Sequence, residues 1–282
     1  MQLLKQMLPS SGLAAAGAAM FLFIFARWWK SASRCAGAIA VGAGYVMGHV
    51  LTAGWSPFPP RHATQWLFWF AIIGVLAAAA DALVRPQGTI RLVIWAIICT
   101  IACRLILRPK FSYSWSAAEG WLWVFAIGLG VVVLTCCLEL VEHGRFGTAT
   151  LFSVTTVVCG GDCIALILSS SLLLGQLACI LTAIAVTCFL LTIVVPAPFH
   201  PRGAAAPLSL VCAGLLVGGF FYAELPATSA LLLALAPAIA LLPVGKQSYS
   251  QSRVLVYRTA FVTVPVAVAV VLALRASPAL DY

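Results

Sequence analysis

The sequence predicts an all-α fold: a polytopic bundle of helices that is integral to a lipid bilayer. Of the 282 residues, 63% are hydrophobic and 8% are charged, whereas soluble domains carry about 25% charged residues. A soluble fold with so few charges would expose large apolar patches and aggregate. The apolar residues also fall in long runs, and a spanning helix needs about 20 of them. The bilayer is therefore the expected solvent of this chain.

Successive apolar runs justify this prediction, and we expect about ten spanning helices, within a range of about 9 to 11. The runs cover residues 9–26, 35–54, 66–84, 90–107, 121–141, 148–170, 177–195, 208–223, 227–244 and 254–274. The connections between the runs are too short for a soluble fold. Residues 1–282 are therefore expected to form a single transmembrane domain.

The first run has the features of a helix that is retained in the protein, and the second has those of a closely packed helix. Only Lys5 precedes the first run, which ends in basic and aromatic residues. A cleavable signal peptide has its positive charge first and small residues at its end, so we expect this run to stay in the protein. In the second run Ala40, Gly44 and Gly48 recur every fourth residue, which predicts close contact with another helix.

The third and fifth runs begin with an internal repeat. Residues 63–72 and 118–127 are identical at six of ten positions, at a separation of 55 residues. Because this separation equals two helices with their connections, both copies are expected to enter the membrane from the same side. The repeat indicates possible duplicated helical hairpins, which occur in transporters and equally suit passive bundles.

Charged residues stand near the ends of the third and fifth runs. Asp81 has Arg85 one turn later, which predicts an i,i+4 ion pair at the membrane edge. Glu139, Glu142 and His143 could form a metal or proton relay, but their spacing matches no known metal motif. A hydrated helix end is the simpler interpretation, and we expect no metal and no cofactor. Glu139 is the second candidate for a transport site.

The sixth run carries the main candidate, Asp162, near its middle. An Asp at a helix centre costs about 2.5–3.5 kcal/mol on an insertion scale, while Leu, Ile, Phe and Val each contribute roughly 0.3–0.6 kcal/mol of stabilisation. Nine such residues occur in residues 148–170 and together contribute about 3–5 kcal/mol of stabilisation. This stabilisation barely compensates for the insertion cost of the acid. Asp162 is therefore expected to face away from lipid, and an intramembrane acid is by default a functional hypothesis.

Helical spacing places other polar residues beside Asp162. Thr155 and Ser169 stand seven residues before and after it, with Cys159 between, which predicts a polar seam on one helix face. Gly160 and Gly161 remove side chains next to the acid, so a neighbouring helix, a water or an ion could approach the backbone. Transporters often place ion sites where such glycines break a helix. Structural hydrogen bonding of Asp162 to a neighbouring helix is the alternative.

The later part of the chain carries a turn, a pair of small residues and a proline that mark its helices. A turn is expected at residues 171–176, and Gly214 with Gly218 predicts another close helix contact. Pro265 is expected to kink the last run. Most of the ten cysteines fall inside apolar runs, where they are expected to pack rather than to form disulfides.

Orientation follows from counting Lys and Arg in alternate connections. One side collects ten and the other six of the 16 basic residues. This bias places both termini on the non-cytoplasmic side of a cell membrane. The same scattered distribution gives no basic patch of the kind that binds nucleic acid.

These observations predict a multi-pass, permease-like carrier of a small solute or ion, in which Asp162 binds or relays a proton or cation. The alternative is a structural or assembly subunit of a membrane complex, without chemistry. No phosphate-binding loop, metalloprotease motif or Gly-x-Ser-x-Gly motif occurs, so we expect no enzyme, and an intramembrane enzyme is the least favoured alternative. The bilayer is the expected partner, and the sequence leaves protein partners and homo-oligomers open.

Overall fold

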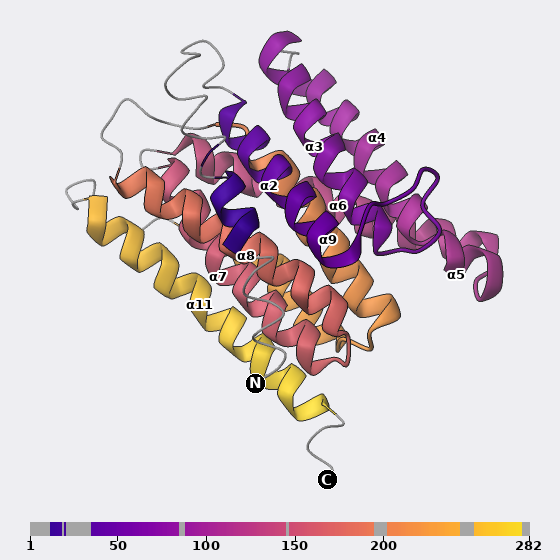
Figure 1. Ribbon diagram of the computed structural model, residues 1–282. Coiled ribbons are helices and arrows are strands. Elements are labelled where there is room, and N and C mark those ends of the chain that lie inside the picture. Colours follow the sequence, from indigo (N-terminus) through magenta and orange to yellow (C-terminus); the bar gives the residue numbers. More distant parts are fainter. Residues whose placement is uncertain are drawn as a thin grey trace.

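The computed structural model describes residues 12–18, 20, 35–84, 88–144, 147–194, 202–242 and 251–277. These residues form helices and short connections, with no strand among them (Figure 1). Eight of the described helices are long and apolar enough to cross a membrane, so a helical membrane bundle is confirmed. The predicted count of about ten is not confirmed. Most of the run at 9–26 lies outside the described residues, and the run at 227–244 contains only the short helix α10 (Ala227–Ile239).

The predicted runs match the helices to within a few residues in most cases. The spanning helices are α2 (Ala36–Ala53), α3 (Gln65–Val84), α4 (Gly88–Ile106), α6 (Ala117–His143), α7 (Gly147–Leu168), α8 (Leu172–Val194), α9 (Ala205–Tyr222) and α11 (Gln251–Ala276). The turn before α8 comes earlier than expected: it is centred on Ser170, whose φ is 66°, and α8 has already begun at Leu172. The short helix α5 (Arg108–Tyr113) was not predicted, because six polar and aromatic residues show no apolar run.

Helix α9 lies at the centre of the bundle. Its residues are buried without interruption from Ala205 to Gly219, and it packs against α2, α3, α4, α6, α7, α8 and α10. Its contact with α3 is very close: a Cβ at Gly74 would lie 2.5 Å from the Cα of Pro207, and a Cβ at Gly214 would lie 2.5 Å from Cδ2 of Leu67. The close helix contact predicted at Gly214 is thus confirmed.

The helix ends gather at two opposite faces because the spanning helices from α2 to α9 alternate in direction. We call one the Arg91 face; α3 and α6 end there and α4 and α9 begin there. The other is the Tyr222 face, where the Tyr222 hydroxyl at the end of α9 donates a 2.8 Å hydrogen bond to the Ile106 carbonyl at the end of α4. Both copies of the sequence repeat therefore enter the bundle from the Tyr222 face, as predicted.

The outer surface of the bundle is apolar, as a bilayer requires. Helix α11 packs along α7 and α10 on one side (Figure 1), and its outward residues Val264, Val268 and Leu274 are exposed. On α4, Leu92 and Ile97 are exposed in the same way. These faces would be in contact with lipid.

Candidate functional site

Asp162 is enclosed by protein. Its exposed fraction is 0%, and neither carboxylate oxygen has a hydrogen-bond partner among the described residues. Beside it, Gly161 admits α10 and α11: a Cβ there would lie 3.2 Å from Leu233 and 2.3 Å from Val266. The close helix approach expected at the glycine pair therefore occurs at Gly161, although α7 continues through it without a break.

The other polar groups of the predicted seam are satisfied locally. The Thr155 hydroxyl donates to the Leu151 carbonyl at 2.8 Å, and the Ser169 hydroxyl donates to the Leu166 carbonyl at 3.0 Å. The sulfur of Cys159 lies 3.3 Å from that of Cys212 on α9. Gly160 faces α8, where a Cβ would make ordinary contact with Thr182 at 3.8 Å. Of these polar groups only Cys159 contacts another helix, and the function of the seam as an ion site stays a prediction.

A charged cavity of about 370 Å³ opens at the Arg91 face between α3, α4, α6 and the start of α9. Its charged and titratable lining residues are Asp81, Arg91, Glu139, Glu142, His143 and Arg202. Trp95, one turn further along α4, and Ala206 of α9 line its apolar part. Glu139, the second candidate from the sequence, is therefore the one predicted transport-site residue that lines this cavity.

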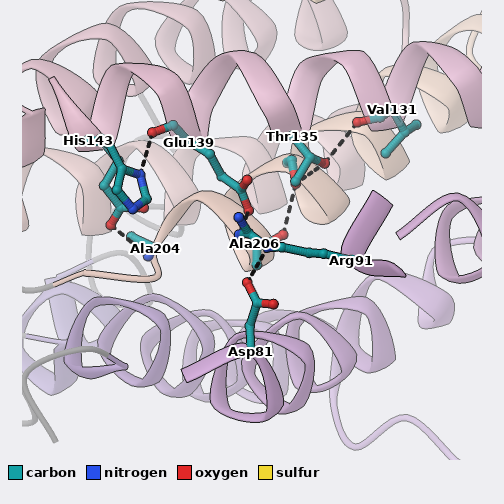
Figure 2. Close-up of polar contacts among 10 residues, drawn as sticks. Asp81, Arg91, Val131, Thr135, Glu139, His143, Ala204 and Ala206 are labelled. Atoms are coloured by element: carbon teal, nitrogen blue, oxygen red, sulfur yellow. Dashed lines mark hydrogen bonds and ion pairs between the residues drawn. The ribbon is translucent and has the colours of Figure 1, made fainter. Parts of the chain in front are cut away.

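Arg91 links three helices across the cavity. Its Nε lies 2.5 Å from Oδ2 of Asp81 on α3, and its Nη2 lies 2.5 Å from Oε1 of Glu139 on α6. Figure 2 shows the guanidinium extended from α4 between these two carboxylates. The predicted partner of Asp81, Arg85, lies outside the described residues; the structure pairs Asp81 with Arg91 instead. We call Asp81, Arg91 and Glu139 the ionic triad.

Glu142 and His143 make different contacts from the triad. The backbone N–H of Ala204 donates to Oε1 of Glu142 at 3.3 Å, which places a buried carboxylate at the N-terminus of α9, where the helix dipole favours negative charge. Nδ1 of His143 donates to the Glu139 carbonyl oxygen at 2.8 Å. Within the described ranges, no group of three or more His, Cys, Asp or Glu residues is arranged to hold a metal ion.

A second cavity, of about 380 Å³, lies at the Tyr222 face; His62, Thr64, Pro109, Leu174 and Tyr222 are among its lining residues. Between the two lies a neck of about 10 Å³, and a single water needs roughly 10–15 Å³. The neck is lined by Phe70, Cys99, Ala102, Cys103, Ile106, Val131, Leu210, Ala213, Gly214 and Val217. The three cavities follow α9 from Ala206 to Tyr222, so an almost closed apolar segment lies between the two larger cavities along this helix.

No family model, curated protein or solved structure matches this chain. The site is therefore defined by its own geometry. Among the residues predicted from sequence, Asp162, Thr155, Cys159, Gly160, Gly161 and Ser169 line none of the three cavities, whereas Glu139 lines the charged one.

The sequence assigned no functional role to Asp81, Arg91 or Arg202, and it placed Glu142 only in a possible relay that was less favoured than a hydrated helix end. The sequence did carry one signal that these four residues lie at the same face. All four stand in or beside connections that the count of Lys and Arg assigned to the same side of the membrane. It did not show which of these residues meet, since that depends on how α3, α4, α6 and α9 pack.

Proposed function

We propose that the protein is a permease-like carrier that moves a small polar solute or ion along α9, between α3, α4 and α6. The observation that supports this proposal is the pair of cavities of about 370 and 380 Å³ at opposite faces, separated by a neck of about 10 Å³. Alternating access requires a barrier between the two faces, because the solute must reach the middle of the bundle from one face at a time, and the neck would supply this barrier. In this proposal the carrier resides in a cell membrane.

The neck would act as the closed barrier. Its lining is apolar apart from the thiols of Cys99 and Cys103, and a dry apolar constriction stops polar solutes without a fixed plug. One turn towards the charged cavity, the hydroxyls of Thr135 and Ser209 lie 2.9 Å apart and are buried. Movement of α9 against α3 and α6 would wet this segment and open the path.

Asp162 would have a role in transport that is separate from the path of the solute. It lies on α7, which packs against α9, and not along the path itself. A proton or cation bound there would bias the position of α7 and α9, which is how a coupling ion drives a carrier. The enclosed position of Asp162 also favours the second candidate function, a structural or assembly subunit whose acid merely packs between helices.

Plugging the neck tests the proposal. Ala213→Trp fills the neck, and Ala267→Trp, at an exposed position on α11, is the matched control. Each full-length protein is reconstituted in liposomes, and light scattering records the flux of a panel of amines, amino acids, carboxylates and sugars. We expect saturable flux of at least one class in the wild type and in the control, and at least a tenfold loss in Ala213→Trp.

Two results would contradict the proposal. Folded wild-type protein that carries no class of solute would favour the structural subunit. Equal flux in Ala213→Trp and Ala267→Trp would show that solute does not pass along α9.

A further inference from the structure

The ionic triad leaves part of each carboxylate unused. Arg91 contacts Oδ2 of Asp81 and Oε1 of Glu139. The remaining oxygens, Oδ1 and Oε2, have no hydrogen-bond or ion-pair partner within the described residues and are not among the fully buried polar atoms. Among the described residues, the cavity therefore presents two carboxylate oxygens without a partner, next to a cation that is already bound.

The described lining of the cavity holds more carboxyl groups than guanidinium groups. Asp81, Glu139 and Glu142 contribute three carboxyl groups, and Arg91 and Arg202 contribute two guanidinium groups. Arg202 is exposed at the mouth. Glu142 already occupies the N-terminus of α9, which would otherwise attract an anion. These features disfavour an anionic ligand.

We propose that this cavity takes a small organic cation, an amine or a guanidine, and that Arg91 occupies the position of that cation until the solute displaces it. The proposal rests on the proposed carrier function and names its substrate class. A volume of about 370 Å³ falls within the usual range of small-molecule sites, about 300–1,000 Å³. Amines and guanidines form charge-assisted hydrogen bonds with carboxylates in the way that Arg91 does.

Displacement would couple binding to opening. Arg91 ties α4 to α3 through Asp81 and to α6 through Glu139 (Figure 2). A solute cation that takes both carboxylates releases the guanidinium, and α4 is then no longer held to either helix at this face. The ligand favours the open arrangement because its contacts with Asp81 and Glu139 exist only when Arg91 is displaced.

Chemical rescue of Arg91→Ala tests the substrate class. Methylguanidinium, at millimolar concentrations and constant ionic strength, is titrated into the purified full-length protein while its melting temperature is recorded. We expect Arg91→Ala to melt below the wild type and to be restabilised saturably, with at least tenfold tighter binding than in the wild type, where Arg91 competes. Arg91→Ala combined with Glu139→Gln should show no saturable stabilisation. Arg275→Ala, at an exposed position at the end of α11 that lines none of the three cavities, should bind as the wild type does.

The wild type provides a measurement that does not depend on the folding of Arg91→Ala. Methylguanidinium should bind at least tenfold more weakly to Glu139→Gln than to the wild type. Equal binding to these two proteins, or saturable binding of acetate in place of methylguanidinium, would overturn the proposal.

Flux separates this inference from the carrier proposal. Methylguanidinium that binds as expected but crosses no faster than in empty liposomes would support the cation site and contradict the carrier. The opposite result is flux of another solute that Ala213→Trp blocks, while methylguanidinium does not bind. It would support the carrier and overturn the cation site.

Discussion

The contact between α3 and α9 fixes the width of the proposed path, and Gly74→Ala perturbs it directly. The new methyl carbon would lie 2.5 Å from Cα, 2.9 Å from N and 3.0 Å from Cβ of Pro207, whereas non-bonded carbons rest at about 3.5–4.0 Å. Backbone and ring atoms cannot rotate away, so the two helices must separate by roughly 1 Å. Such overpacking costs about 1–3 kcal/mol, and Ala in place of Gly in a helix interior stabilises by about 1 kcal/mol.

We therefore expect Gly74→Ala to lower the free energy of unfolding by up to about 2 kcal/mol relative to the wild type, and by about 1–3 kcal/mol relative to a Gly→Ala change that meets no neighbour. Gly130→Ala on α6 is the matched control, because a Cβ there meets nothing within 4 Å and only the helix propensity changes. Reversible unfolding in mixed micelles with increasing SDS measures both variants. Gly130→Ala should be as stable as the wild type or slightly more stable. Equal stability of the two variants would refute the close α3–α9 contact.

Three further substitutions test other parts of the structure. Glu142→Gln removes the charge at the N-terminus of α9 and should lower the free energy of unfolding by about 1 kcal/mol; a gain in the SDS titration would contradict the contact with Ala204. Tyr222→Phe loses the hydrogen bond to Ile106 and should cost about 0.5–1.5 kcal/mol, and no change in the same titration would mean that the hydroxyl bonds to water. Asp162→Asn keeps the side-chain size and should abolish proton- or cation-dependent flux in liposomes while the protein still accumulates. Unchanged flux would remove Asp162 from the mechanism, and failure to accumulate would show that the acid is structural.

The positions of the helices could be predicted from sequence because each spanning helix must bury its own backbone hydrogen bonds in an apolar stretch. The predicted run at 66–84 and the helix α3 (Gln65–Val84) differ by one residue. The run at 177–195 missed the first turn of α8, because no charge or proline separates it from α7. Short α5 lies in a polar aromatic loop and has no such signal.

The partners of the charged residues could not be predicted in the same way. Spacing along one helix suggested Arg85 for Asp81, since i,i+4 pairs are the only ones that a single sequence reveals. The partner in the structure, Arg91, belongs to the next helix, and Glu139 of the same triad is 48 residues further on. The position of Asp162 near the middle of its run drew attention to α7, whereas the cavities depend on the packing of four other helices.

Water access along α9 is the measurement that tests the central claim most directly. Single cysteines are introduced at Ala206, Gly218 and Thr155 in a chain whose native cysteines are replaced by serine or alanine, and membrane vesicles are labelled from each side with an impermeant maleimide. We predict that the cysteine at 206 reacts from one side only, the cysteine at 218 from the opposite side only, and the cysteine at 155 from neither. Labelling at 155 together with protection at 206 and 218 would contradict it and would move the path to α7.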